Sequence, residues 1–209
     1  MKISVVIPCF NERDTIEQIL QAVRAAPLES FEVIVVDDGS TDGTAAILRE
    51  KCPQLADQVI SQNPNRGKGA AVRAGFAAAT GDVILIQDAD LEYDPADYAA
   101  LLAPILAGKA DAVYGSRFMG GQSHRVVYFW HMAGNKFLTL LSNMCTNLNL
   151  TDMEVGLKAF RAETVQRMKL REDRFGFEPE ITARLAQAGS RIYEVGISYP
   201  DGPTRKEKK

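Results

Sequence analysis

Short apolar runs alternate with amphipathic segments through the first 115 residues, and this alternation constrains the fold more than any other feature of the sequence. Ile3–Pro8 is a continuous apolar run, as expected of a strand covered on both faces, and Glu32–Asp37 predicts a second buried strand. Further strands are expected over Gln58–Ser61, Asp82–Gln87 and Ala110–Tyr114. The segments between them predict helices over Glu12–Ala26, Asp42–Lys51, Lys68–Thr80 and Pro95–Leu106. Strands separated by helices predict an α/β fold with a mostly parallel, twisted sheet and helices on both faces.

The rest of the chain is less regular. A helix is expected over Val127–Asn147, a loop and short strand over 151–161, a helix over Glu178–Gln187 and a last strand over Arg191–Ile197. The length of 209 residues fits a single domain, and no repeat or interdomain linker is visible.

Charge and cysteine content exclude some classes of protein. The chain has 24 basic and 27 acidic residues, and this balance does not favour nucleic-acid binding. Its three cysteines (Cys9, Cys52 and Cys145) show no paired spacing, which favours a reducing compartment over a disulfide framework. No secretory signal or transmembrane stretch is visible, so we expect a cytoplasmic location or a peripheral one at the cytoplasmic face of a membrane.

Acidic residues follow three of the predicted strands. Glu12 comes after the first strand and Asp37-Asp38 close the second, while Asp88, Asp90 and Glu92 follow the strand over Asp82–Gln87. The carboxyl ends of parallel strands meet at one edge, so we expect Asp37 and Asp90 to face a common cavity there. Asp88 and Asp90 would project to the same side of extended backbone, joined by Glu92 if the chain stays extended. Grouped carboxylates would hold Mg²⁺ or Mn²⁺, whereas the plainer interpretation of each acidic residue is a helix cap.

Two further segments leave alternatives open. No P-loop or GxGxxG signature is present, and the stretch Asn65–Ala70 places Lys68 at a helix start, either as a phosphate ligand or in a solvated turn. The apolar stripe of the helix over Val127–Asn147 would contact a bilayer, pack into the core or form half of a homodimer contact. The basic tail would approach anionic headgroups or simply be solvated.

Taken together, the motifs VVIPCFNE, VVDDGSTDGT, NRGKGAAVRAGF, GDVILIQDADLEYDP and YGSRF resemble family 2 glycosyltransferases of the GT-A fold. The similarity is greatest to the dolichol- or polyprenyl-phosphate mannose and glucose synthase branch, and it runs from Met1 to about Tyr199. It implies one GT-A domain with a nucleotide-sugar half (1–115), an acceptor half (116–199) and a basic tail (200–209). The implied reaction is an inverting, metal-assisted transfer of a hexose from a GDP- or UDP-sugar to a lipid phosphate.

The resemblance also implies roles for individual residues. In the donor site, Asp88 and Ala89 would lie beside the ribose and diphosphate, Asp90 and Glu92 would face the metal with Asp88 nearby, and the remaining contacts would come from Pro8, Phe10, Glu12, Asp37, Asp38 and Lys68. On the acceptor side, Arg117 of the GSR element would meet the acceptor phosphate with help from Arg125, and Asp152 would be a base or orient the acceptor. The chain departs from the branch at Pro203, where an arginine is expected.

Two other functions remain open at this point. A sugar hydroxyl is a poor nucleophile at neutral pH and would need Asp152 as its base, whereas a lipid phosphate is already anionic and needs cationic positioning by Arg117 and Arg125. A non-catalytic nucleotide-sugar-binding protein would bind the donor without turnover, and the acidic set of Asp88, Asp90 and Glu92 argues against it.

Overall fold

A computed structural model describes residues 1–120 and 128–198 of the chain. Its strands are β1 (Ile3–Cys9), β2 (Phe31–Asp37), β3 (Gln58–Ser61), β4 (Val83–Ile86), β5 (Ala112–Ser116), β6 (Lys158–Arg161) and β7 (Ile192–Gly196). Its helices are α1 (Ile16–Arg24), α2 (Thr44–Leu55), α3 (Lys68–Ala78), the 3₁₀ turn η1 (Pro95–Asp97), α4 (Tyr98–Leu106), α5 (Phe129–Thr146), α6 (Ala162–Gln166) and α7 (Phe177–Gln187).

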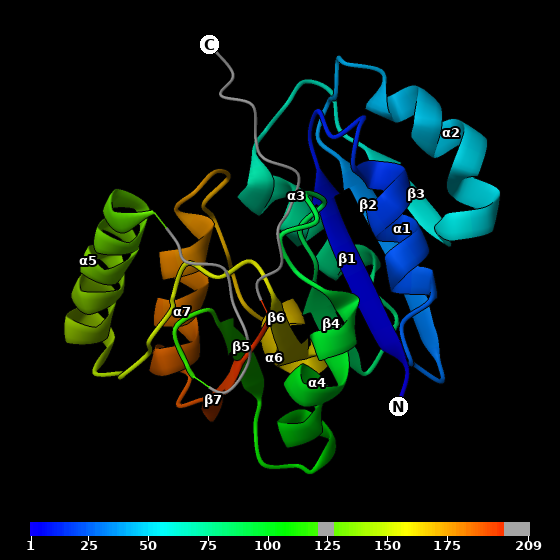
Figure 1. Ribbon diagram of the computed structural model, residues 1–209. Helices are drawn as coiled ribbons and strands as arrows, with labels where there is room; N and C mark the ends of the chain where they lie inside the picture. The colour runs from blue at the N-terminus through cyan, green and yellow to red at the C-terminus, as the bar shows by residue number, and fades with distance from the viewer. Residues whose placement is uncertain (121–127, 199–209) are drawn as a thin grey trace.

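The strands form one twisted sheet in the order β3-β2-β1-β4-β6-β5-β7 (Figure 1). β1 is parallel to β2 and β4, β2 is parallel to β3, and β5 is parallel to β7. β6 is inserted between β4 and β5 and is antiparallel to both. The predicted α/β class and mostly parallel sheet are therefore confirmed, and the reversed direction of β6 is a feature that the sequence analysis did not specify.

Helices cover both faces of the sheet, as expected. α1, α2 and α4 lie on one face, and α3 and α7 lie on the other (Figure 1). Every residue of β1 is buried, so the strand is apolar on both faces rather than alternating. On the α3 side, the ring of Phe76 packs edge-on against Phe160 of β6 and Phe177 of α7 and thereby joins the two parts of the chain in one core.

Most of the predicted elements form, with shifted ends. α1 begins at Ile16 rather than Glu12, because residues 12–15 make a turn in which the Glu12 carbonyl accepts the Thr15 amide hydrogen at 3.2 Å. α6 was not expected; it follows β6 directly and has only five residues, too few for a helical period to show in the sequence.

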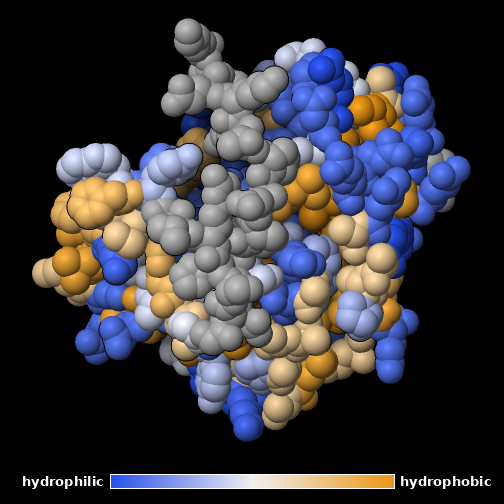
Figure 2. Space-filling view, in the orientation of Figure 1, coloured by the Kyte–Doolittle hydropathy of each residue, from blue (hydrophilic) through white to orange (hydrophobic). Residues whose placement is uncertain are grey.

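α5 lies beside α7 at the edge of the molecule, away from the sheet (Figure 1). Thr139 is its buried residue, while apolar side chains along it are exposed: Phe129, Trp130, Phe137, Leu138, Leu140, Leu141 and Met144. In the space-filling view these side chains contribute an apolar surface over α5 (Figure 2). The expectation that this stripe packs into the core is therefore wrong. None of the helices within residues 1–120 and 128–198 has the length and apolarity needed to span a bilayer.

α3 approaches β1 so closely that only a glycine fits at the contact. A Cβ atom on Gly75 would lie 2.2 Å from Cγ1 of Val6, which has no exposed surface and no room to move. This contact fixes α3, and with it the Lys68 end of the helix, against the central strand.

We expect Gly75→Ala to lower the free energy of unfolding by about 1–3 kcal/mol, because the added methyl overpacks the contact with Val6. Urea denaturation followed by circular dichroism measures the change. Gly134→Ala in α5 is the matched control: nothing lies within 4 Å of its Cβ position, and alanine favours a helix over glycine by about 0.5–1 kcal/mol. Equal stability of the Gly75→Ala variant and the wild type would contradict the contact.

Candidate active site

A cavity of about 450 Å³ lies where β1, β2 and β4 end. Residues that the sequence analysis singled out line it: Pro8, Phe10, Glu12, Asp38, Lys68, Asp88, Ala89 and Asp90. Three segments that are far apart in the sequence therefore supply its walls, as expected for ligand sites at the carboxyl edge of a parallel sheet.

Asp37 is not among the residues that line this cavity. Its carboxylate accepts the Ser40 amide hydrogen at 3.1 Å and lines a neighbouring cavity of about 700 Å³ with Arg49 and Gln62. Asp38 lines the first cavity, and its two oxygens accept the amide hydrogens of Arg66 and Gly67 at 2.8 and 2.6 Å. Successive residues at a strand end point to opposite sides, which separates the two side chains. The expectation that Asp37 and Asp90 share one cavity is wrong.

Glu92 does not line this cavity, although its amide donates to the Asp90 carboxylate at 3.2 Å. β4 ends at Ile86 and Ala89-Asp90 form a turn, so the backbone does not stay extended from Asp88 to Glu92. Leu91 has a φ of 63°, a left-handed conformation that is uncommon for a leucine and reverses the chain after Asp90. Asp88 and Asp90 line the cavity and Glu92 does not. Within the described residues, no three acidic, histidine or cysteine side chains are grouped as a metal site.

Asp90 is nevertheless in an environment that favours a cation. Burial raises its pKa to about 7, and the neighbouring carboxylates of Asp88 and Glu92 add to the effect. A bound divalent cation would reverse this penalty, and an all-oxygen donor set suits Mg²⁺ or Mn²⁺, which also takes ligands from substrate phosphates. The carboxylate oxygens at this edge thus suit such an ion chemically, and Asp88, Asp90 and Glu92 as its ligands stay a prediction.

Lys68 is paired with carboxylates rather than placed in a solvated turn. Its Nζ lies 2.9 and 3.1 Å from the two oxygens of Asp88 and 3.1 Å from Oε1 of Glu178. The solvated-turn alternative is therefore wrong, and direct binding of phosphate by Lys68 stays a prediction.

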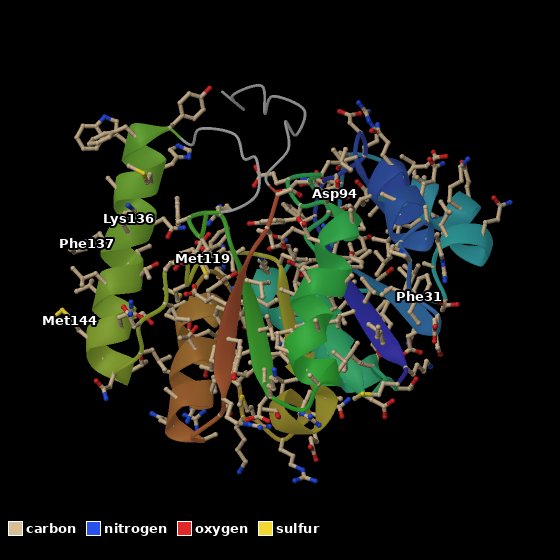
Figure 3. All side chains as sticks on the ribbon, turned by 60° about the horizontal axis from the view of Figure 1, so that its bottom comes forward. Phe31, Asp94, Met119, Lys136, Phe137 and Met144 are labelled. Carbon is tan, nitrogen blue, oxygen red and sulfur yellow. The ribbon has the colours of Figure 1, made fainter. Side chains whose placement is uncertain are left out.

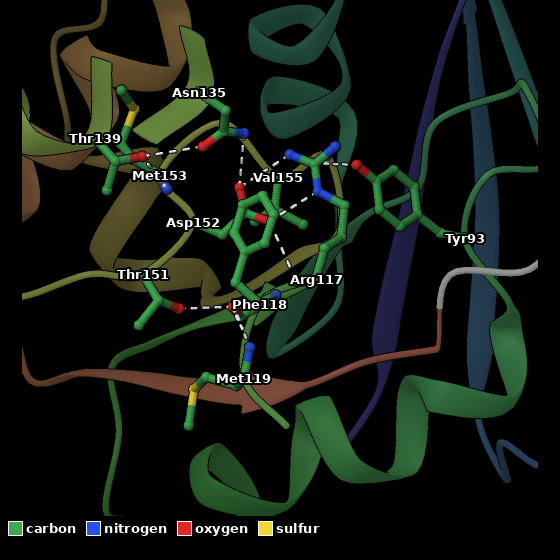
Figure 4. A network of polar contacts seen from close by, with 12 residues as sticks. Tyr93, Arg117, Phe118, Met119, Asn135, Thr139, Thr151, Asp152, Met153 and Val155 are labelled. Atoms are coloured by element: carbon green, nitrogen blue, oxygen red, sulfur yellow. Dashed lines mark hydrogen bonds and ion pairs between the residues drawn. The ribbon is translucent and has the colours of Figure 1, made fainter. Parts of the chain in front are cut away.

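Arg117 and Asp152 form a second polar centre (Figure 4). Nε and Nη2 of Arg117 donate to the two carboxylate oxygens of Asp152 at 2.7 and 2.9 Å. The Arg117 amide and the Asn135 side chain also donate to Asp152, at 3.1 and 3.0 Å. Asp152 has no exposed surface, so this buried pair depends on its bidentate geometry.

The two centres meet at Gly156. A Cβ there would lie 1.9 Å from Oδ2 of Asp88, and the Gly156 amide donates to the Tyr93 hydroxyl at 3.0 Å. Tyr93 and Arg117 lie side by side in the close view (Figure 4). The segment that carries Asp152 thus also forms the wall behind Asp88.

Some predicted residues lie outside the described part of the chain. Arg125 belongs to residues 121–127, and Pro203 and the basic tail belong to residues 199–209. Their predicted roles stay predictions.

The structure adds cavity residues that the sequence analysis missed. Arg174 and Phe175 line the cavity from the segment before α7, so residues beyond 116 also contribute to the predicted donor half. Glu178 reaches Lys68 from α7 itself. An arginine and an aromatic residue before a helix carry no distinctive spacing, so only the tertiary structure identifies them.

Comparison with known proteins identifies the relatives of the chain. Residues 4–168 match the family described as Glycosyl transferase family 2. The chain is 32% identical over 212 residues to an undecaprenyl-phosphate mannosyltransferase from Micrococcus luteus, a match that covers 95% of this chain and 84% of the relative. A dolichol-phosphate mannosyltransferase from Pyrococcus furiosus is 29% identical over 202 residues, which cover 95% of this chain and 56% of that protein. The branch that the motifs indicated is confirmed.

The chain spans less than two thirds of several of these relatives. It covers 56% of an undecaprenyl-phosphate 4-deoxy-4-formamido-L-arabinose transferase from Pseudomonas savastanoi pv. phaseolicola, with 31% identity over 195 residues and 91% of this chain. Among solved structures, glucosyl-3-phosphoglycerate synthase from Mycobacterium tuberculosis, in complex with Mn²⁺, UDP and phosphoglyceric acid, aligns with a TM-score of 0.77. That alignment covers 98% of this chain and 71% of the other at 24% identity, and it shows the shared fold.

We expect Asp90→Asn to stabilise the metal-free protein at pH 7.5 by roughly 1–3 kcal/mol. Unfolded Asp90 ionises near pH 4, whereas the folded group keeps its proton until about pH 7. The unfolded state alone therefore loses this proton between pH 4 and 7, and wild-type stability falls across that window relative to the variant. Urea denaturation in chelator at pH 4 and pH 7.5 measures the difference.

Asp14→Asn is the control. The Asp14 side chain is 86% exposed, so the loss of its charge should change the free energy of unfolding very little at either pH. A stability difference for Asp90→Asn that is the same at pH 4 and pH 7.5 would show that Asp90 is not in a crowded acidic environment.

Proposed function

The chain belongs to glycosyltransferase family 2, and on this premise we propose that it transfers a hexose, mannose or glucose, from a GDP- or UDP-sugar to a polyprenyl or dolichyl phosphate. The observation that carries the proposal is the contact between two centres: an acidic cavity with Asp88 and Asp90, and the Arg117–Asp152 pair joined to it through Gly156. One centre suits a nucleoside diphosphate with its metal, and the other suits an anionic acceptor.

The donor nucleotide occupies the 450 Å³ cavity in this proposal. Pro8 and Phe10 offer apolar surface to the nucleoside, and Asp38 sits beside them on the same wall. Asp37 faces the adjoining cavity of about 700 Å³, where its carboxylate is available to a base that extends past the strand end.

Mg²⁺ or Mn²⁺ would be held by Asp90, with Asp88 and Glu92 nearby and the remaining ligands supplied by the donor diphosphate and water. Such an ion would neutralise the negative charge that develops on the leaving nucleoside diphosphate. The solved relative in complex with Mn²⁺ and UDP supports this assignment.

The acceptor phosphate binds at Arg117, whose guanidinium Asp152 holds in a fixed plane. A phosphate oxygen attacks the anomeric carbon from the side opposite the diphosphate. The new carbon–oxygen bond forms as the bond to the diphosphate breaks, and the electron pair leaves with the nucleoside diphosphate. No proton has to be removed from the acceptor, which is already an anion.

Asp152 acts indirectly in this scheme. Each of its oxygens already accepts two hydrogen bonds, from the Arg117 side chain and amide and from Asn135. Both oxygens are thus engaged within the protein, and neither is left to accept a hydrogen bond from an acceptor hydroxyl in this arrangement. This arrangement favours the lipid phosphate over a sugar hydroxyl as the acceptor.

α5 places the protein on the membrane that holds this lipid. Trp130 is 79% exposed and Met144 73% exposed, and Phe137 and Met144 project from the side of α5 that faces away from the sheet (Figure 3). Aromatic and aliphatic groups along one helix suit the interface of a bilayer. Peripheral binding through α5 would bring the acceptor to Arg117.

We expect transfer of labelled mannose or glucose from a GDP- or UDP-sugar with Mn²⁺ to polyprenyl phosphate, and none to an oligosaccharide. Arg117→Lys should raise the acceptor KM about tenfold with little change in the donor KM, because lysine keeps the charge but loses the bidentate pairing with Asp152. The assay is initial-rate kinetics with each substrate varied in turn. Arg167→Lys, at an exposed position after α6, is the control. Product formed only with the oligosaccharide would contradict the lipid acceptor.

We expect the wild-type protein to bind phospholipid vesicles and the Trp130→Ser/Phe137→Ser variant to bind about tenfold more weakly, because each aromatic side chain removes apolar area from water. Vesicle flotation measures binding, and fluorescence of Trp130, the single tryptophan, reports insertion in the wild type. Leu106→Ser removes an apolar side chain that is 53% exposed, from α4 rather than α5, and should leave binding unchanged. Vesicle binding equal to wild type, or a homodimer that buries α5, would contradict the membrane assignment.

A further inference from the structure

Glu178 is a buried carboxylate in α7 that the proposed reaction does not use. Its residue is 4% exposed, and Oε1 lies 3.1 Å from Nζ of Lys68. Its second oxygen, Oε2, is buried and has no hydrogen-bond partner among the atoms of the described residues. Burying a charged carboxylate is costly unless an opposite charge compensates it, so the contact with Lys68 is the reason that Glu178 is tolerated there.

Lys68 distributes one ammonium group over three carboxylate oxygens. Besides Glu178, its Nζ contacts both oxygens of Asp88, at 2.9 and 3.1 Å. Burial by itself lowers the pKa of Lys68, but Asp88 and Glu178 raise it well above its usual value, so the group is a permanent cation. An ammonium has three hydrogens to donate, and the two carboxylates offer an acceptor for each of them.

Asp88 is confined from the opposite side as well. The space beyond its Oδ2 is occupied by Gly156, where even a methyl group would come within 1.9 Å. Lys68 on one side and the Gly156 backbone on the other leave this carboxylate one position in the wall of the cavity.

Backbone packing fixes the distance between Lys68 and Glu178. The start of α3 lies directly against the segment before α7: the Ala70 amide donates to the Asp173 carbonyl at 3.0 Å. A Cβ on Gly69 would lie 2.2 Å from the Glu172 carbonyl oxygen. The two helix starts therefore form one unit that holds the ammonium between the two carboxylates.

We propose that Glu178 is a positioning residue for the donor site: it holds Lys68, and Lys68 in turn holds the carboxylate of Asp88 in place against the bound nucleotide. The inference rests on the proposed function for the identity of the donor. In this inference Lys68 binds carboxylates of the protein rather than the donor phosphates. Glu178 of α7 then helps to fix the position of Asp88 in the cavity wall.

A double-mutant cycle of Glu178→Gln and Lys68→Met tests this order of action. The measurement is the dissociation constant of UDP and of GDP, each with Mn²⁺, by isothermal titration calorimetry. For whichever nucleotide binds the wild type, we expect each single variant to raise the dissociation constant about tenfold. The double variant should bind that nucleotide no more weakly than Lys68→Met does. The donor KM should rise by a similar factor, with the acceptor KM unchanged. Glu163→Gln, at an exposed position of α6, is the matched control and should bind like the wild type.

Additive losses in the double variant would overturn the proposal, because Glu178 would then act independently of Lys68. Wild-type affinity in Glu178→Gln would overturn it as well. Should Glu178→Gln fail to fold, Glu178→Asp takes its place in the cycle: it keeps the buried charge but withdraws it by one methylene, and the same non-additivity with Lys68→Met is expected.

The readout is nucleotide binding, so it separates this inference from the proposed function. A wild type that binds nucleotide but transfers no sugar to polyprenyl phosphate refutes the function and leaves the cycle to decide the role of Glu178. A wild type that transfers sugar while the cycle is additive refutes only the positioning role. A wild type that binds neither nucleotide contradicts both.

Discussion

The antiparallel insertion of β6 between β4 and β5 is the constraint on which the site depends. Because β6 runs against its neighbours, its first residue, Lys158, pairs with the last residue of β4, Ile86, and with Tyr114 near the end of β5. The segment that enters β6 therefore arrives at the edge where β4 and β5 leave. Had β6 run parallel, Asp152 and Gly156 would lie at the opposite edge of the sheet. The reversal brings the Arg117–Asp152 pair and the Asp88 cavity into contact through Gly156.

Positively and negatively charged side chains alternate at this buried edge of the sheet. Asp88, Lys68 and Glu178 are linked in series by contacts of about 3 Å, and Lys158 lies beyond them at the start of β6. Burial lowers the pKa of Lys158 to about 8, while the carboxylate of Glu178 opposes that effect. The two lysines and the two carboxylates of this series nearly cancel in charge, so their burial together is less costly. Asp90 lines the cavity outside this series, and burial together with the carboxylates of Asp88 and Glu92 raises its pKa to about 7.

β1 and β4 could be predicted because buried parallel strands are continuous apolar runs. β3, whose end residues are exposed, also agrees with its predicted bounds. The cavity beyond β1, β2 and β4 followed from the rule that strand ends converge, which grouped Phe10, Asp38 and Asp90 along its wall. The rule did not predict which individual side chains face the cavity. Asp37 faces a neighbouring cavity because side chains alternate along the strand end, and the left-handed backbone at Leu91 turns Glu92 away from the cavity wall. Glu178 was beyond prediction because its role depends on the packing of α7 against α3, which no local pattern encodes.

The same packing bears on the nature of the acceptor. A base for a hydroxyl acceptor needs a carboxylate oxygen that faces the acceptor, and two of the buried carboxylates near the site face cations of the protein instead: Asp152 pairs with Arg117 and Glu178 with Lys68. A carboxylate that turned toward an acceptor hydroxyl would give up its ion pair and leave a cation without its partner at this edge, which is costly. A phosphate acceptor avoids that cost, because it arrives as an anion and meets Arg117 without any change in protonation. These two ion pairs thus favour an anionic acceptor over a hydroxyl, while the lipid part of the proposed acceptor rests on the relatives.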